Sequence, residues 1–310
     1  MPACIHVAAG SAPLPDPLSH RVEGVCCDCV LGSGLWRLRK WNESLKTAAG
    51  GGDLGLVRID DRGDAGHVAH VTINNPAKRN ALGMAGKRAI ASAFSRLSQD
   101  GKLRAVVLTG AGDRSFIAGA DLAEMKDLSV EEAEEEHTLT HYACDSIRRC
   151  PVPVIARVNG YCFGAGMELA ASCDMRASAD HAKFGMPEVR VGLPSGMEAA
   201  LLPSLLGWGR AAELVLTGDI FDAKDMYQFG FVQKLVPAAE LDAAVDKWIQ
   251  SILISGARAV RLQKSLLRDW ERMSLTDSIR RGIEMCVEAR RTDEPSKLMA
   301  AFLARKKSQG

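Results

Sequence analysis

NGYCFGAGME, residues 159–168, is a glycine-rich junction between a predicted strand and a predicted helix. It follows a strand predicted over 154–158, and the later half of 161–174 has the apolar spacing of a helix. A second junction of this kind, FIAGADL at 116–122, follows a strand predicted over 104–109. The first N–H groups of a helix lack internal partners and carry partial positive charge. Two such helix starts that face one point would form an oxyanion hole, a site for an oxygen that becomes negative during reaction.

Small residues at these junctions also have a purely structural explanation. Glycine and alanine serve tight turns and allow backbone segments to pack closely. For either junction taken alone, the packing role and the oxyanion hole are equally well supported. The choice between them depends on the rest of the chain.

Outward from the junctions, the N-terminal part of the chain changes character near residue 55. Residues 1–54 contain three prolines near their start, a triple glycine near their end and no sustained apolar period, which predicts a poorly ordered extension outside the core. Apolar residues from 56 to 59 and from 68 to 73 flank a turn-forming run and predict a β-hairpin. A helix predicted over 84–97 then precedes the strand at 104–109, so that β and α segments alternate.

A long acidic helix is predicted between the two junctions. It begins after Ser129, because Glu132 completes a capping box, and it ends near Cys150, before two prolines. Its EEAEEE run predicts a solvent-exposed face. His137 and His141 lie four residues apart, but the TLT between them lacks the Glu of a zinc-protease helix. Both histidines are therefore predicted to be surface residues.

The remaining pattern is strand-like over 182–191 and then helical almost to the C-terminus. The helices are predicted over 196–206, 210–216, 239–254, 258–273, 276–291 and 295–306. The last third of the chain is therefore expected to be mostly α-helical.

Composition places the chain among ordinary soluble globular proteins. With 310 residues, 47% of them hydrophobic and 25% charged, it can bury a core without a metal or a disulfide. The formal net charge of +1 gives no general attraction to nucleic acid or to an anionic membrane. No stretch approaches the roughly 18 uncharged apolar residues of a membrane-spanning helix. Composition thus argues against a nucleic-acid partner and against a membrane span.

Cysteine usage favours a reducing compartment. The nine cysteines are odd in number and scattered, at positions 4, 26, 27, 29, 144, 150, 162, 173 and 286, unlike the framework of a small secreted domain. The N-terminus lacks the charged and apolar regions of a signal peptide. The cluster at 26, 27 and 29 is too tightly spaced for the usual zinc-ligand pairs and predicts inert thiols. We predict a cytoplasmic protein without a metal site.

Several common catalytic signatures are absent from the sequence. It contains no G-x-S-x-G elbow, no G-x-x-x-x-G-K-[ST] loop and no complete G-x-G-x-x-G after a strand. Gly164-Ala165-Gly166 lacks the third glycine of the last motif. The two glycine-rich junctions are what remains to carry chemistry.

Four segments in order resemble the crotonase superfamily, which comprises the enoyl-CoA hydratases and isomerases. They are NPAKRNAL at 75–82, AGAD at 118–121, 159–170, and FGMPEV at 184–189 with GLP at 192–194. The match extends from about residue 56 to the C-terminus. The resemblance implies an α/β fold, a crotonase-like spiral of ββα repeats over 55–237. It also implies a C-terminal α-helical region over 238–310 that packs against neighbouring copies in a homotrimer or homohexamer.

The resemblance further implies where the thioester binds. The N–H groups of Ala120 and Ala165 would form the oxyanion hole, and Ala165 keeps its N–H although relatives commonly have glycine there. The CoA groove would be lined by Lys78, Arg79, Asn80, Ala81, Ala118, Asp121 and Leu122. Ala123 stands where relatives often have a lysine near the CoA phosphates, and only Lys126 lies close, which leaves the phosphate contacts open.

Glu168 and Glu188 occupy the positions at which hydratases of the family carry two catalytic glutamates. Adding water to a double bond needs one group that takes a proton from water and one that delivers a proton to the α-carbon. We expect Glu168 to position and activate the water and Glu188 to transfer the α-carbon proton. If both share a closed apolar pocket, one of their pKa values should be raised. The alternative is a helix-dipole role for Glu168 and a surface position for Glu188.

A third carboxylate, Glu198, follows the GLP segment, where the family frequently has a glycine-rich turn. It is predicted to be a charge at a helix start, with a contact to substrate as the alternative.

The implied function is that of an enoyl-CoA hydratase, which adds water across the 2,3 double bond of a 2-enoyl-CoA to give a 3-hydroxyacyl-CoA through a stabilised enolate. The substrate is an acyl-CoA thioester, and no metal or redox cofactor is expected. Within the family, the alternatives are an isomerase, a decarboxylase or a hydrolase of CoA thioesters. Outside enzymes, the alternative is a non-catalytic relative that binds acyl-CoA or RNA, against which the presence of Glu168 and Glu188 argues.

Overall fold

The chain passes back and forth between two β-sheets, and this path determines where the site forms. The computed structural model describes residues 57–308, which belong to one compact unit, Asp53–Gly310. The predicted N-terminal extension over 1–54 lies outside the described residues. No described helix is both long enough and apolar enough to cross a membrane.

The larger sheet has six strands in the order β1-β2-β3-β5-β7-β10, and the smaller has four in the order β4-β6-β8-β9. The six strands are β1 Val57–Asp61, β2 His67–Ile73, β3 Leu103–Gly110, β5 Val154–Val158, β7 Met175–Ala179 and β10 Lys234–Val236. The four are β4 Ser115–Ile117, β6 Tyr161–Phe163, β8 Lys183–Gly185 and β9 Ile220–Asp222. The pairs β1–β2 and β8–β9 are antiparallel and the other pairs are parallel.

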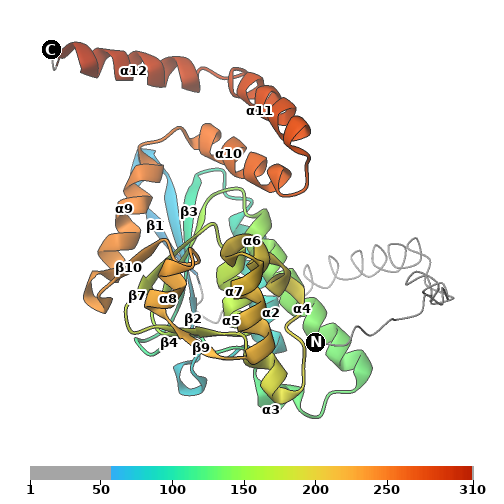
Figure 1. Ribbon diagram of the computed structural model, residues 1–310. Helices are drawn as coiled ribbons and strands as arrows, with labels where there is room; N and C mark the ends of the chain where they lie inside the picture. Colours follow the sequence, from blue (N-terminus) through green and yellow to red (C-terminus); the bar gives the residue numbers. More distant parts are fainter. Residues whose placement is uncertain (1–56, 309–310) are drawn as a thin grey trace, which may run out of the picture. The chain divides into compact units, whose positions relative to one another are not determined.

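Helices fill the connections and make up the C-terminal part. The α-helices are α2 Met84–Leu97, α3 Leu122–Met125, α4 Val130–Arg149, α5 Ala165–Ser172, α6 Leu202–Leu206, α7 Trp208–Thr217, α8 Ala223–Gln228, α9 Leu241–Leu253, α10 Ala257–Trp270, α11 Leu275–Ala289 and α12 Glu294–Ser308. The 3₁₀ helices are η2 Gly63–Ala65, η3 Pro76–Lys78, η4 Pro187–Val191, η5 Met197–Leu201 and η6 Ala238–Glu240. In Figure 1 the last four α-helices, α9 to α12, follow one another in orange and red.

Each turn of the chain contributes one strand to each sheet and then enters a helix. β3 is followed by β4 and α3, β5 by β6 and α5, and β7 by β8 and η4. Because β4, β6 and β8 pair in parallel, they leave the small sheet at one edge, and the three helix starts gather there. This confirms the predicted spiral of ββα repeats.

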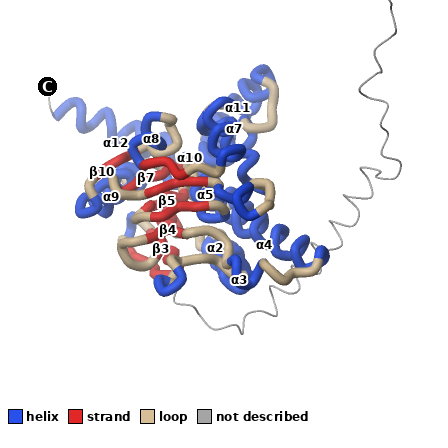
Figure 2. The backbone as a smooth tube through the Cα atoms, turned by 60° about the horizontal axis from the view of Figure 1, so that its bottom comes forward, coloured by secondary structure: helices blue, strands red, loops and turns tan. Residues whose placement is uncertain are grey.

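The large sheet is covered on both faces, and its central strands β3 and β5 are accordingly rich in apolar residues and mostly buried. Side chains alternate between the faces of a strand. Val106 and Leu108 of β3 therefore join the main core with Phe94 of α2, while Val107 joins a second cluster with Val245 of α9. Figure 2 shows α9 on one side of the strands and α2, α4 and α5 on the other.

Several local predictions are confirmed. The hairpin β1–β2 forms around the Asp-rich turn, and α2 has the predicted bounds. The capping box of α4 is complete, since the Ser129 side chain accepts from the Glu132 N–H and the Glu132 side chain accepts from the Ser129 N–H.

Three local predictions are wrong. The segment 182–191 is a strand only over β8, because Pro187 opens the 3₁₀ helix η4. The chain after Pro194 is not uniformly helical, since β9 extends the small sheet and β10 extends the large one. The acidic run of α4 is not entirely solvent-exposed, because Glu136 is buried and forms an ion pair with the buried Lys87 of α2.

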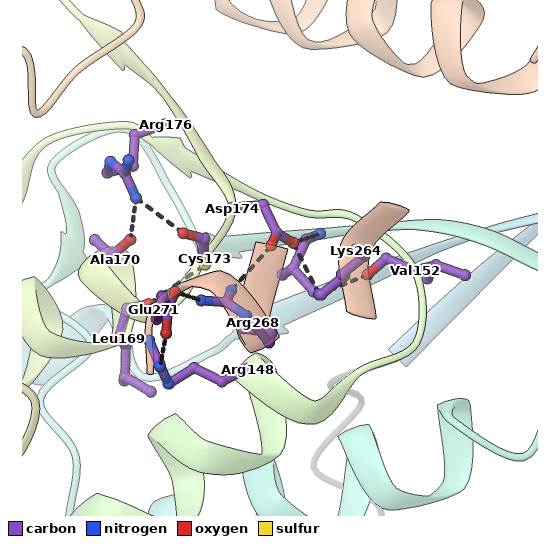
Figure 3. Close-up of polar contacts among 11 residues, drawn as sticks. Arg148, Val152, Leu169, Ala170, Cys173, Asp174, Arg176, Lys264, Arg268 and Glu271 are labelled. Carbon is purple, nitrogen blue, oxygen red and sulfur yellow. Dashed lines mark hydrogen bonds and ion pairs between the residues drawn. The ribbon is translucent and has the colours of Figure 1, made fainter. Parts of the chain in front are cut away.

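A polar network fixes α10 to the loop after α5 (Figure 3). Asp174 accepts from Lys264 at 2.8 Å and from Arg268 at 2.9 Å, both on α10. The Lys264 ammonium also donates to the Val152 carbonyl at 2.7 Å. Because Lys264 is buried, its charge depends on these two partners. The C-terminal helices are thus joined to the segment that carries α5.

Candidate active site

Two glycine turns from successive passes of the chain meet at the edge of the small sheet. Gly119 follows β4 at φ +112°, and Gly164 follows β6 at φ +50°. A Cβ on Gly164 would lie 3.9 Å from the Gly119 Cα, and a Cβ on Gly119 would lie 3.3 Å from the Phe163 carbonyl oxygen. These distances place the backbones of the two turns within about one side-chain atom of each other. The two junctions identified in the sequence are therefore neighbours in space.

The residues that follow these glycines, Ala120 and Ala165, have N–H groups that do not take part in the hydrogen bonding of the adjoining bridge and helix. Ala165 is the first residue of α5, a position with no acceptor inside the helix. Ala120 forms a parallel bridge with Leu82, in which Leu82 donates to the Gly119 carbonyl and accepts from the Asp121 N–H, both at 2.9 Å. The N–H of Ala120 itself must then point away from Leu82.

Ala120 and Ala165 line one cavity of about 210 Å³ together with Glu168 and Glu188. Most of its wall is apolar, from Leu122, Met125, Phe163, Pro187, Val191, Leu193 and Met197. An enclosure of this composition weakens the solvation of any charge inside it. The structure therefore brings together the two predicted glutamates and the two predicted amide positions.

Glu168 lies in the first turn of α5 and is only 2% exposed. Its Oε1 accepts a hydrogen bond from the N–H of Ala199 at 3.1 Å. Burial raises its pKa to about 8, and the charges of Glu188 and Glu198 add to the rise while the Ala199 hydrogen bond opposes it. This is the raised pKa that the sequence led us to expect for one of the pair.

Glu188 reaches the cavity from η4 and lies directly opposite the turn before α5. Its Oε2 accepts a hydrogen bond from Ser195 Oγ at 2.8 Å. Its Oε1 lies so close to Gly164 that a Cβ there would come within 2.5 Å of it. The predicted alternative, in which Glu188 is a surface residue, does not describe this half-buried position in the cavity wall.

The residues predicted for the CoA groove separate into two groups. Ala118 and Leu122 line the cavity beside Ala120. Lys78, at the end of η3, donates to Asp121 at 2.6 Å, and this hydrogen bond lowers the pKa of Asp121 and raises that of Lys78. Asp121 also caps α3 through the Ala123 N–H.

The loop 79–81 supports the first junction. Arg79 and Asn80 have φ values of +53° and +59°. Asn80 is fully buried, and its side chain bonds to the Ala111 and Ser115 carbonyls at 3.0 and 2.9 Å and to the Asn75 N–H at 2.9 Å. The backbone of Arg79 accepts from the Ala118 N–H at 3.2 Å. Asn80 therefore holds the loop through its side chain and through its N–H, which donates to the Asn75 carbonyl at 2.8 Å, and its carbonyl remains for the predicted contact with CoA.

The two histidines of α4 are half-exposed and not isolated on the surface. Nδ1 of His137 lies 2.8 Å from Oε2 of the buried Glu136, and Nδ1 of His141 forms a 2.8 Å hydrogen bond with Oε1 of Glu198. His137 and Glu136 also line the cavity. Spacing four on one helix places both histidines on one face, but nothing in the sequence near them indicated their carboxylate partners.

No group of three or more His, Cys, Asp or Glu side chains within the described residues is arranged to hold a metal ion. The cluster Cys26, Cys27 and Cys29 lies outside the described residues.

Sequence comparison identifies the family to which this arrangement belongs. The model of the enoyl-CoA hydratase/isomerase family matches residues 63–309. The chain belongs to this family. The crotonyl-CoA hydratase of Syntrophomonas wolfei is 36% identical over 242 residues, which cover 78% of this chain and 93% of that protein. The short-chain-enoyl-CoA hydratase of Clostridium acetobutylicum is 32% identical over 79% of this chain and 94% of that protein.

Solved structures of enoyl-CoA hydratases share the fold. That of Bacillus anthracis superposes with a TM-score of 0.77 at 27% identity, covering 81% of this chain and 96% of the other. That of Mycobacterium smegmatis gives 0.76 at 30% identity with the same coverage. The two alternating sheets and the helical C-terminus are thus the crotonase fold.

The segment after Pro194 differs in its structure from the sequence prediction. After Pro194, where a glycine-rich turn is frequent in the family, Ser195 reaches back to Glu188. The helix that follows begins as the 3₁₀ helix η5 and not as the predicted α-helix. Glu198 does lie in its first turn, yet it is buried and bonded to His141, so its predicted role as a helix-end charge is incomplete.

Proposed function

We propose that the protein is an enoyl-CoA hydratase that converts a 2-enoyl-CoA and water to a 3-hydroxyacyl-CoA. Family membership and the relatives named as hydratases support this proposal. The observation that carries it is the presence of two carboxylates, Glu168 and Glu188, in one largely apolar cavity with Ala120 and Ala165. Hydration needs two proton-transfer groups, and this cavity supplies them beside two backbone donors.

In the proposed mechanism, the N–H groups of Ala120 and Ala165 hold the thioester oxygen, and they bind it more tightly as negative charge develops on it in the enolate. Glu168 takes a proton from water as the oxygen of that water bonds to C3. Glu188 gives a proton to C2, so the pair of carboxyls carries one proton before and after the step. The raised pKa of Glu168 means that the proton of the pair lies on Glu168 in the free protein near neutral pH, so the proposed mechanism requires this proton to pass to Glu188 when substrate binds. Once ionised, a carboxylate with a raised pKa is a better proton acceptor.

The CoA part of the substrate is proposed to lie along the loop from Lys78 to Ala81 and along Ala118, Asp121 and Leu122. The Lys78 ammonium is more than half exposed beside Asp121, which leaves donors free for a polar group of CoA. The reaction is redox-neutral and uses protein donors for the oxyanion. The proposal therefore includes no metal and no redox cofactor.

The protein is further proposed to form a homotrimer or homohexamer. Leu275, Ile279, Ile283 and Val287 recur every four residues along α11 and are exposed, and Leu298, Met299, Phe302 and Leu303 are exposed on α12. Apolar surface of this extent favours an interface with another copy. Light scattering after size-exclusion chromatography should give three or six times the chain mass, and a monomer at micromolar concentration would contradict this part.

A cytoplasmic location is proposed from the thiols. All five described cysteines, Cys144, Cys150, Cys162, Cys173 and Cys286, are free. Free thiols persist where the compartment is reducing. Cell fractionation with a periplasmic or organellar marker enzyme as reference tests this location.

The deciding experiment is to mix purified protein with crotonyl-CoA and follow the absorbance of the conjugated thioester. We expect the absorbance to fall and mass spectrometry to find a product heavier by one water. The double variant Glu168→Gln/Glu188→Gln should lose turnover and keep CoA binding. Release of free CoA thiol would indicate a hydrolase, and an isomeric product of unchanged mass would indicate an isomerase. No reaction with a panel of chain lengths, at any enzyme level, would refute the hydratase proposal.

A further inference from the structure

The carboxylate of Glu168 depends on a single backbone donor. Among the described residues, the N–H of Ala199 supplies the one hydrogen bond that this carboxylate accepts, at 3.1 Å to Oε1. The same N–H lies 2.9 Å from the Gly196 carbonyl, so it is shared between two acceptors. The orientation of the peptide between residues 198 and 199 therefore sets the position of the proposed water-activating group.

The 3₁₀ helix that carries this peptide, η5, has a start that is not stabilised by its own residues. η5 spans Met197–Leu201, and its first residue has φ +42°, which is unfavourable for a side chain with a Cβ. Its N-cap is Gly196, which provides no side-chain hydrogen bond to the free N–H groups. A strained, uncapped turn of this kind persists only when its surroundings fix it.

Glu198 provides an anchor for this turn. The residue is 6% exposed, and its Oε1 forms a 2.8 Å hydrogen bond with Nδ1 of His141, on the neighbouring helix α4. Its Oε2 is buried and has no hydrogen-bond partner within the part of the chain that the structure describes. A buried carboxylate with one unsatisfied oxygen is costly, and an apolar side chain of similar size would be expected to stabilise the fold at least as well. Stability alone therefore does not account for Glu198.

We propose that Glu198 and His141 are positioning residues that clamp η5 against α4 and so hold the Ala199 N–H on the carboxylate of Glu168. The pair acts through the peptide that joins residues 198 and 199. Neither residue is among those lining the cavity, so neither is proposed to touch the substrate. The catalytic consequence of the clamp rests on the proposed hydratase function, whereas its effect on the Glu168 carboxyl does not.

The clamp also places a negative charge near Glu168. The charged or titratable groups around Glu168 are Glu188 from η4, Glu198 from η5, Lys87 from α2, and Cys144 from α4, with His141 of α4 behind Glu198. The charge of Glu198 adds to the burial that raises the pKa of Glu168. Replacing Glu198 by an uncharged isostere should therefore lower that pKa. A residue with only a packing role would leave it unchanged.

The first test follows the titration of the Glu168 carboxyl by carbon-detected NMR in the full-length protein without substrate, with the signal assigned from Glu168→Gln. Glu198→Gln, which removes the charge but can keep the bond to His141, should move the midpoint downward from about 8, whereas His141→Leu, which breaks the clamp, should move it upward, because the Ala199 hydrogen bond lowers this pKa. The matched control is Asp100→Asn, which alters another carboxylate–imidazole pair, Asp100 with His67 at 2.7 Å, away from η5 and α4. An unchanged midpoint in His141→Leu, or an equal shift in Asp100→Asn, would overturn the proposal.

The second test uses turnover of crotonyl-CoA. His141 is half exposed, so its variants are expected to fold even if Glu198 variants do not. His141→Leu, which cannot donate to Glu198, should lower kcat about 10- to 100-fold with little change in KM, because small displacements of a reacting group are costly. His141→Gln, which can donate, should recover most of the loss. Wild-type kcat in His141→Leu would overturn the proposal.

The two tests separate this inference from the proposed function. If the wild-type protein hydrates no enoyl-CoA, the hydratase proposal fails and the NMR titration still decides whether Glu198 acts on Glu168. If the wild type is active while His141→Leu retains full kcat, the hydratase proposal stands and the clamp is refuted.

Discussion

Gly164 and Glu188 are in direct contact across the cavity, with the space for a Cβ on Gly164 already occupied by Oε1 of Glu188 at 2.5 Å. The glutamate can move because this oxygen is at the end of a flexible side chain. We therefore predict that Gly164→Ala displaces the carboxylate and lowers kcat about 100-fold. The Gly164 backbone, at φ +50° and ψ −122°, lies outside the regions that a residue with a Cβ favours and adds about 1 to 3 kcal/mol of destabilisation. Steady-state kinetics with thermal denaturation measures both effects.

The control for this change is Gly192→Ala. Gly192 also has a positive φ, +81°, in the αL region, but no atom of the described residues lies within 4 Å of the position of its Cβ. Its replacement should cost about 1 kcal/mol through backbone strain alone and keep most of the activity. Equal loss of kcat in the two variants would show that backbone strain, and not the displacement of Glu188, accounts for the effect.

Single replacements of the two carboxylates should separate chemistry from binding. Glu168→Gln and Glu188→Gln each remove one proton-transfer group, and we expect kcat to fall by a factor of about 10² to 10⁴ while the affinity for CoA is retained. Stopped-flow kinetics and calorimetry with CoA measure the two quantities. The exposed Glu240→Gln is the control, and full activity in either site variant would remove that residue from the mechanism.

The raised pKa of Glu168 predicts a pH dependence of stability. The folded protein holds the proton up to about pH 8, whereas the unfolded chain releases it near 4.5, the ordinary pKa of a glutamate. Between these values the folded state binds more protons, so the free energy of unfolding should fall as pH rises from 4.5 to 8. The full effect is on the order of a few kcal/mol. Urea denaturation at pH 5.5 and 8.5 measures it.

Glu168→Gln should remove this part of the pH dependence, since the amide does not titrate. If the wild type and the variant showed the same change in unfolding free energy between the two pH values, the raised pKa would not belong to Glu168.

Asp174→Asn should destabilise the protein by about 3 kcal/mol, because it leaves the buried Lys264 without its carboxylate partner. Chemical denaturation measures the loss. The control is Asp293→Asn, which breaks an exposed pair with Lys297 and should leave the stability nearly unchanged. A loss no larger than that of the control would show that the network in Figure 3 does not fasten α10 to the core.

Where the sequence carries a local signal, prediction succeeded. Ser129 and Glu132 mark the start of α4 because a capping box is made by residues three apart. The strand β5 is a short apolar run bounded by prolines and by Asn-Gly, and its bounds are those predicted. The order of the family motifs identified Glu168 and Glu188 as a candidate pair, and both residues line one cavity in the structure.

Features that depend on partners distant in sequence were not predictable in this way. β10 is only three residues long, and its identity as a strand comes from pairing with β7 more than 50 residues earlier. The burial of Glu136 follows from Lys87, 49 residues away, and that of Glu198 from His141, 57 residues away. A single sequence gives no signal that joins such pairs, so both carboxylates looked like surface charges.

The alternation of the chain between two sheets has a further consequence. Each winding contributes to the cavity: Ala120 lies on the first, Ala165 and Glu168 lie on the second, and Glu188 lies on the third. The two amide positions thus belong to the first two windings, and the third winding contributes only an acid group. A substitution on the third winding can therefore change the proton-transfer chemistry while both amide positions on the first two windings are kept. This arrangement is suited to evolutionary diversification.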